Sequence, residues 1–305
     1  MTSKTSIPAL VRPHKRPRQP LPANAADCHM HVFGPFDRYP LAAERSYNVD
    51  EAPLAAHEAM KRDVGLTRTV LVQASGYGTD NRSLIAALDE LGPRGRGVVV
   101  VDADVSEREL AALHEHGSRG VRLNLVTLKG RYGGDIPGLL DVFARRIKDL
   151  GWHLQLFADG ATIAALEPAL ARSPVAIVVD HMGLPDARAG LGQAGFQALI
   201  RLLRGGPVWA KLAGADRITR ATGRLADAVP FMQALADANV DRLVWGSDWP
   251  HIGFHAGTAV AHHDVLAYRP LDAGELLDVL ITAVPDAVQR EKILSANPAR
   301  LYQFT

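Results

Sequence analysis

Eight short apolar runs alternate with helix-like segments along most of this chain, and this alternation limits its fold more than any other feature. The apolar runs cover residues 25–32, 68–74, 97–103, 120–125, 153–157, 175–180, 208–212 and 242–246. Between them lie segments with helical periodicity that are long enough to cross back over a sheet, among them 83–91, 107–116, 139–150, 161–171, 196–203 and 225–239. Strands that alternate with helices in this way pair in parallel.

The runs are rich in Val, Ile and Leu, which indicates strands that are buried on both faces. Eight such strands predict a single closed (β/α)8 barrel, an α/β fold that usually takes roughly 250 residues. The chain has 305 residues, which leaves room for an N-terminal arm and a C-terminal cap. An open doubly wound sheet is the alternative, but its dinucleotide-binding fingerprint is missing, because the glycines within 92–97 precede a strand and do not open a helix.

The first 22 residues differ from the rest of the chain. Basic residues at positions 4, 12, 15, 16 and 18 are interspersed with prolines at 8, 13, 17, 20 and 22, which prevents a regular helix or strand. We therefore expect an arm over 1–22 and one catalytic domain over 23–305. The arm is expected to be solvated or wrapped on the surface. Its packing on a neighbouring subunit, and hence a homo-oligomer, stays open.

Composition indicates a partner that is a small molecule. The net charge is +1, so there is no strong overall field to attract nucleic acid. Cys28 is the single cysteine and cannot form an internal disulfide, and no apolar run approaches the ~20 residues of a membrane span. The sequence thus predicts no nucleic-acid or membrane partner and a cytoplasmic location.

Polar residues gather where the predicted strands end, and this is the place where barrel enzymes carry their chemistry. His29 and His31 lie two apart in the first strand, so both side chains point to the same face. His181 follows the sixth strand and Asp248 follows the eighth. We expect these four residues to form one catalytic site, since buried polar groups need partners and these can supply one another.

Two chemistries use three imidazoles and one carboxylate. A divalent ion, zinc or manganese, bound by His29, His31, His181 and Asp248 acts as a Lewis acid and lowers the pKa of its water. Without an ion, the imidazoles polarise a carbonyl while Asp248 takes a proton from water. Both routes are hydrolysis. A binuclear centre is disfavoured, because the fourth and fifth strands end without a bridging lysine or glutamate.

Several strings of residues resemble a known family. His-x-His followed by Val-Phe-Gly-Pro occupies 29–35, and Trp-Gly-Ser-Asp-Trp-Pro-His occupies 245–251. Further matching segments lie at 73–75, 79–81, 120–124, 180–183 and 216–217. In this order they resemble the amidohydrolase superfamily, within it the branch that contains 2-pyrone-4,6-dicarboxylate hydrolase, from about residue 27 to residue 302.

The resemblance implies a lactonase that opens a carboxylated lactone, with Asp248 activating water and the three histidines polarising the carbonyl. It also implies substrate contacts from Tyr47, Ser75, Arg122 and Arg217, and we add Asn124 and His251, which follow the fourth and eighth strands. The pyrone hydrolase is thought to need no metal, and we favour none here, with zinc or manganese as the alternative. A metal-dependent decarboxylase and a lactone isomerase of the same superfamily remain open.

Three departures from the family pattern bear on the substrate. Phe157 stands where the pyrone hydrolase has a tyrosine, and Leu184 stands where it has an arginine. A further family arginine has no ungapped counterpart, although Lys129 or Arg131 could reach its place. Fewer donors should weaken the binding of a dicarboxylate, so the sequence favours a lactone with one carboxylate or a differently placed acid group such as a sulfonate.

Overall fold

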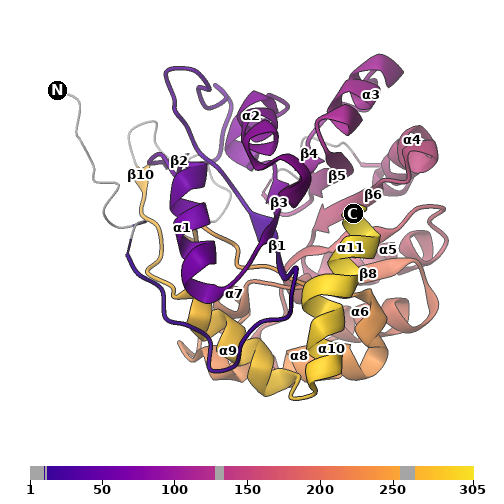
Figure 1. Ribbon diagram of the computed structural model, residues 1–305. Helices are drawn as coiled ribbons and strands as arrows, with labels where there is room; N and C mark the ends of the chain where they lie inside the picture. The colour runs from indigo at the N-terminus through magenta and orange to yellow at the C-terminus, as the bar shows by residue number, and fades with distance from the viewer. Residues whose placement is uncertain (1–9, 11, 128–133, 255–264) are drawn as a thin grey trace.

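The computed structural model describes residues 10, 12–127, 134–254 and 265–305. Eight parallel strands follow one another around a barrel in chain order (Figure 1). They are β1 (Ala26–Met30), β3 (Arg68–Val72), β4 (Gly95–Val99), β5 (Ser118–Asn124), β6 (His153–Phe157), β7 (Ile177–Val179), β8 (Val208–Leu212) and β9 (Leu243–Trp245). The predicted single (β/α)8 barrel is therefore confirmed.

Helices surround the barrel and fill the connections between its strands (Figure 1). They are α1 (Leu54–Val64), α2 (Arg82–Leu91), α3 (Glu107–Glu115), α4 (Ile136–Ile147), α5 (Gly160–Ala171), α6 (Ala194–Gly205), α7 (Ala215–Ile218) and α8 (Val229–Asn239), followed by α9 (Ala273–Ala283), α10 (Ala287–Glu291) and α11 (Asn297–Tyr302). Short polar side chains begin several of them. Ser106 caps α3 and Asp159 caps α5, each accepting a hydrogen bond from a backbone N–H of the first turn. Within the described part of the chain, no helix combines the length and apolar character that crossing a bilayer requires.

The barrel closes between β1 and the segment that follows β9. The backbone N–H of Asp248 donates to the carbonyl of His29 at 2.8 Å, and that of His31 donates to the carbonyl of Trp249 at 2.9 Å. Gly246 permits this approach, because a Cβ at this position would lie 2.6 Å from the Cβ of His29. Closure therefore brings together two motifs that lie more than two hundred residues apart in the sequence.

Strand β4 begins two residues earlier than predicted and ends four residues earlier. It runs over Gly95–Val99, whereas the sequence indicated 97–103. Its two glycines allow α2 to pack directly on the strand, since a Cβ at Gly95 would lie 2.7 Å from the Cβ of Leu91. Glycine has little strand propensity, so a pattern of apolar residues does not predict that the strand begins at Gly95. Helix α1, the helices after β9 and the short pair β2 (Asn48–Val49) and β10 (Val265–Leu266) were likewise not placed from the sequence.

The described part of the arm, residues 10 and 12–22, contains no helix or strand and lies along α9. The backbone N–H of Lys15 donates to Asp272 at 3.1 Å, and that of Arg18 donates to Asp278 at 2.8 Å. The side chain of Lys15 also pairs with Glu275. The basic arm thus binds the acidic residues on the outer face of a helix in its own chain.

Candidate active site

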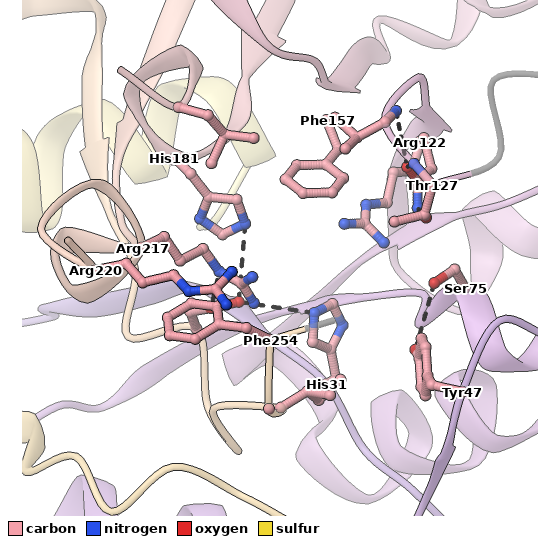
Figure 2. A pocket seen from close by; sticks show the side chains of 16 residues that line it. His31, Tyr47, Ser75, Arg122, Thr127, Phe157, His181, Arg217, Arg220 and Phe254 are labelled. Atoms are coloured by element: carbon pink, nitrogen blue, oxygen red, sulfur yellow. Dashed lines mark hydrogen bonds and ion pairs between the residues drawn. The ribbon is translucent and has the colours of Figure 1, made fainter. Parts of the chain in front are cut away.

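A cavity of about 270 Å³ opens at the carboxyl ends of the strands (Figure 2). It brings together eight of the residues that the sequence singled out. These are His31, Tyr47, Ser75, Arg122, Asn124, His181, Arg217 and Asp248. The remaining wall is formed largely by Val126, Thr127, Phe157, Leu184, Arg220, Ile252, Gly253 and Phe254.

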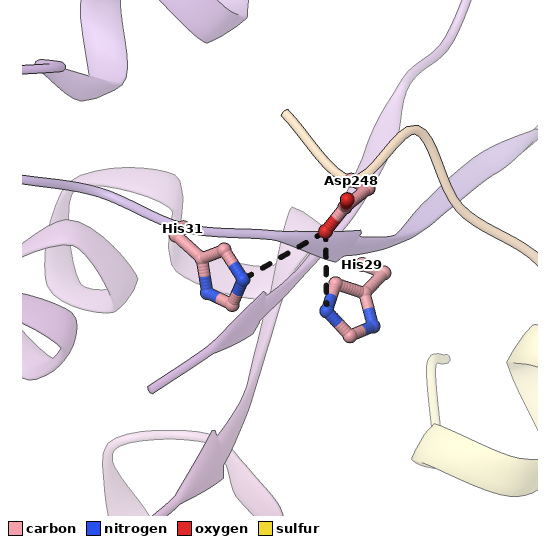
Figure 3. Close-up of side chains that lie close together, drawn as sticks. All are labelled: His29, His31 and Asp248. Atoms are coloured by element: carbon pink, nitrogen blue, oxygen red, sulfur yellow. Dashed lines mark ion pairs between the residues drawn. The ribbon is translucent and has the colours of Figure 1, made fainter. Parts of the chain in front are cut away.

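One carboxylate oxygen lies at the centre of the site. Oδ1 of Asp248 is 3.8 Å from Nε2 of His29, 4.0 Å from Nε2 of His31 and 3.8 Å from Nε2 of His181. Figure 3 shows Asp248 facing the first two imidazoles. All four side chains are buried, and this oxygen has no hydrogen-bond partner among the described residues. The space between these four atoms is where a water molecule or an ion can bind.

The partners of the ring nitrogens assign the tautomer of His31 and place His29 between an acceptor and a donor. Nδ1 of His31 lies 2.7 Å from the carbonyl oxygen of Val72, and Nδ1 of His29 lies 3.2 Å from Oδ1 of Asp180. A carbonyl oxygen only accepts, so the proton of His31 belongs on Nδ1. Nδ1 of His29 faces both the acceptor Asp180 and the donor Nζ of Lys211, which lies 3.3 Å away. Burial lowers the pKa of both imidazoles, that of His31 to about 3. In the neutral ring of His31, therefore, Nε2 presents a lone pair toward Asp248.

Two guanidinium groups hold the second oxygen of Asp248. Nε of Arg217 donates to Oδ2 at 2.7 Å, and Nη2 of Arg269 lies 3.6 Å from the same atom. Burial by itself raises the pKa of this carboxyl, but the neighbouring charges, with Arg217 the strongest, hold it well below its usual range. Arg269 is in turn paired with Asp216 at 2.6 Å. Sequence reasoning missed Arg269, which lies beyond β10 and outside every motif.

A layer of buried polar side chains supports the site from within the barrel. Nζ of Lys211 donates to Gln155 at 2.7 Å, and the amide of Gln155 donates to Asp180 at 3.1 Å. Nζ also lies 3.3 Å from Nδ1 of His29, a longer contact than the one to Gln155. Burial lowers the pKa of Lys211 to about 8. Lys211 and Gln155 thus fix the carboxylate of Asp180, which in turn orients the ring of His29.

Further predicted residues lie at the opposite end of the cavity from Arg217 (Figure 2). Arg122 donates to the carbonyl of Gln73 at 3.1 Å, and its Cζ lies 5.6 Å from the centre of the Phe157 ring. The hydroxyl of Ser75 is 3.4 Å from that of Tyr47. Hydroxyl and guanidinium donors therefore face the cavity from this side, as binding of an anionic ligand requires.

Two predicted substrate-binding residues, Asn124 and His251, have other surroundings or other contacts. The amide of Asn124 donates to the hydroxyl of Thr127 at 2.6 Å and so shapes the loop after β5. His251 does not belong to the described wall of this cavity. It is buried and lines a separate space of about 60 Å³ beneath the arm, next to His14. Lys129 and Arg131 lie outside the described residues.

Two residues of the cavity wall, Arg220 and Phe254, were not identified from the sequence. Arg220 follows Arg217 by three residues, and the N–H of Arg220 approaches the carbonyl of Arg217 at 3.4 Å. Residues three apart on a helical turn share a face, so this spacing was a usable signal.

Cys28, by contrast, is buried in the barrel interior, in a cluster that includes Val70, Val244 and Tyr302. The strand register is irregular between Asp27 and Met30, and this interrupts the alternation that predicted Cys28 to face away from the imidazoles.

The donor set fits one divalent ion. Ligand atoms of His29, His31 and Asp248 all lie within 4.8 Å of one another, and so do those of His29, Asp180 and His181. Three imidazole nitrogens and one carboxylate oxygen are a common set for zinc. Oδ1 of Asp248 and Nε2 of His29 are buried without a hydrogen-bond partner among the described residues, so both are available for such an ion.

Comparison with known proteins places this site in a family context. The family model described as "Amidohydrolase" matches residues 26–304. The 2-pyrone-4,6-dicarboxylate hydrolase of Comamonas testosteroni is 35% identical over 297 residues, which are 94% of this chain and 92% of the relative. The 4-sulfomuconolactone hydrolase of Rhizobium radiobacter is 34% identical, over 92% of this chain and 91% of the relative. A crystal structure described as a candidate 2-pyrone-4,6-dicarboxylic acid hydrolase from Pseudomonas putida superimposes with a TM-score of 0.76 at 35% identity, covering 93% of this chain and 99% of that one.

Proposed function

Because this chain belongs to the amidohydrolase family, we propose that it is a hydrolase that opens an anionic lactone by attack of water on the ring ester. One observation carries the proposal: Oδ1 of Asp248 is surrounded by three imidazole nitrogens in a cavity that arginines line. Two relatives that match almost the whole chain are lactone hydrolases by name, which supports the same reaction class.

The geometry supports Asp248 as the general base. We infer that His29, like His31, carries its proton on Nδ1, where Asp180 can accept it. A water molecule bound among Oδ1 of Asp248 and Nε2 of His29 and His31 then meets only acceptors, so both its protons point toward them. Its lone pair is then free to attack the carbonyl carbon. As the new C–O bond forms, Asp248 takes a proton from the water, the ring C–O bond breaks, and the proton passes to the leaving oxygen.

This arrangement gives two of the histidines a different role from the one that the resemblance implied. With the proton on Nδ1, His29 and His31 accept from the water and do not donate to the lactone carbonyl. Arg217 lies beside Asp248 and lines the cavity, so its charge offsets the negative charge that develops on the carbonyl oxygen.

We further propose that no metal is required. Four cations pair with three carboxylates around the site. Arg122 and Lys211 pair with Asp180, Arg217 pairs with Asp248, and Arg269 pairs with Asp216. The net charge of this group is already +1, and a divalent ion would raise it to +3 in a buried environment, which is costly. The alternative is one zinc or manganese ion held by His29, His31, His181 and Asp248, which would supply a Lewis acid and lower the pKa of a bound water.

A panel of lactones tests the proposed function. 2-Pyrone-4,6-dicarboxylate, 4-sulfomuconolactone and a lactone with one carboxylate would each be offered to the purified protein, and ring opening would be followed by proton release and product analysis. Hydrolysis of at least one acid lactone is expected. A product that keeps a lactone ring would reassign the chain as an isomerase, and release of carbon dioxide would reassign it as a decarboxylase.

A further inference from the structure

Arg220 presents a guanidinium to the cavity mouth that the proposed reaction does not use. Its side chain lines the cavity and is solvent-exposed, with Cζ 4.5 Å from the centre of the Phe254 ring. Stacking on an aromatic ring leaves the edge of a guanidinium, with its N–H donors, free to bind an acid group. No ion pair involves Arg220 among the residues that the structure describes.

The neighbouring arginines are already engaged. Arg217 donates from Nε to Asp248 at 2.7 Å, and Arg269 pairs with Asp216 at 2.6 Å. Arg269 also lies 4.2 Å from the ring of Phe254, so the two arginines Arg220 and Arg269 hold this ring in the cavity wall. Among these three guanidiniums, Arg220 is the one that a ligand can engage without breaking an ion pair of the described residues.

Arg220 and Arg122 lie on opposite sides of the cavity, with His31 between them in Figure 2. The described wall carries three arginines and one carboxylate, which is a net charge of +2 if the buried imidazoles are neutral. The wall therefore carries positive charge at both ends. A ligand with acid groups at both ends matches this distribution better than one with a single acid group.

We propose that Arg220, stacked on Phe254, binds an acid group of the substrate at the end of the cavity opposite Arg122. The inference rests on the proposed function, which it deepens by assigning a specificity determinant. In this proposal Arg220 supplies a guanidinium from another element, in place of the hydrogen-bond donors that the family pattern has at Phe157 and Leu184. Arg217 then serves Asp248 and the reacting carbonyl, and Arg220 serves the acid group.

Binding of a ring dicarboxylate tests the proposal independently of hydrolysis. Calorimetry would compare benzene-1,3-dicarboxylate with benzoate on the wild type, on Arg220→Met, and on Arg224→Met as a control. Arg224 is exposed, lies four residues further along and pairs with Asp227, outside the cavity wall. We expect the wild type to prefer the dicarboxylate, and Arg220→Met to raise its Kd about ten- to a hundredfold, as for a lost hydrogen bond to a charged group.

Arg224→Met should bind both ligands as the wild type does. Arg220→Lys keeps the charge but not the planar fork, so it should recover only part of the loss. The proposal is overturned if the wild type does not bind the dicarboxylate more tightly than benzoate. It is also overturned if the Kd of Arg220→Met for the dicarboxylate stays within twofold of the wild-type value, or if Arg220→Lys has the wild-type Kd. Absence of hydrolysis on every acid lactone would instead refute the proposed function and leave this binding result to stand on its own.

Discussion

Oδ1 of Asp180 lies 3.2 Å from Nδ1 of His29, and the opposite ring nitrogen of His29 faces Asp248 at 3.8 Å. We infer that the carboxylate of Asp180 sets both the tautomer and the direction of this imidazole. Replacing a residue that orients a ligating or catalytic side chain typically lowers activity by about 10–100-fold.

Replacing Asp180 should disturb catalysis more than substrate binding. In Asp180→Asn the amide can donate to Nδ1 of His29, which favours the tautomer with the proton on Nε2 and spoils the acceptor that faces the water. We expect kcat to fall by about 10–100-fold with KM changed less than threefold. Steady-state kinetics on the best lactone of the panel would measure this, and an unchanged kcat would mean that the tautomer of His29 is irrelevant.

Asp248→Asn should retain the fold and ligand binding while turnover falls by roughly 10²–10⁴, the usual effect of losing a general base. Kinetics and circular dichroism would be measured together, with Asp227→Asn as a control, since Asp227 lies outside the cavity and pairs with Arg224. Retention of most of the turnover in Asp248→Asn would rule out the proposed role.

Arg217→Met should shift the pH dependence of activity. Arg217 is the strongest of the groups that lower the pKa of Asp248, and the ionised carboxylate is the active form. In the wild type the base therefore stays ionised as the pH falls, whereas without Arg217 the carboxyl protonates at a higher pH. The acid limb of the profile of kcat/KM should move to higher pH in the variant. An acid limb at an unchanged pH would show that Asp248 does not control it.

Removal of metal should leave activity intact. We expect a chelator followed by gel filtration to preserve turnover, and elemental analysis of the active protein to find less than stoichiometric zinc and manganese. Loss of activity on chelation that is restored by zinc or manganese would establish the alternative, in which the four residues His29, His31, His181 and Asp248 bind an ion.

Gly246→Ala should destabilise the closure of the barrel. The added Cβ would lie 2.6 Å from the Cβ of His29 and 2.7 Å from its backbone nitrogen, a contact that only backbone movement can relieve. Overpacking of this kind costs about 1–3 kcal/mol, which urea unfolding can detect. Gly205→Ala is the matched control, since a Cβ there meets no atom within 4 Å. Equal free energies of unfolding for the two variants would show that the backbone at the closure can move enough to accept the added Cβ.

Local patterns in the sequence determined the barrel and the four central residues of the site. Alternation of apolar runs and helices depends on neighbouring residues alone, and the carboxyl ends of parallel strands meet at one end of a barrel. The pattern therefore suffices to place His29, His31, His181 and Asp248 together. The family resemblance adds the inward positions of Tyr47, Ser75, Arg122 and Arg217.

Tertiary structure alone decided how these groups are paired and oriented. Arg269 reaches Asp248 from beyond β10, His251 lines a separate space beneath the arm, and Arg220 enters the cavity wall on the turn after α7. The positions of Arg269 and His251 do not follow from a local period, because each depends on how loops distant in sequence pack over the barrel mouth. For Arg220 the spacing from Arg217 was a usable signal, but its place in the wall still depends on the packing of Phe254. The tautomer of His31 likewise depends on a carbonyl acceptor from another strand, and that of His29 depends on Asp180 and Lys211, so the direction of their lone pairs is a property of the assembled barrel.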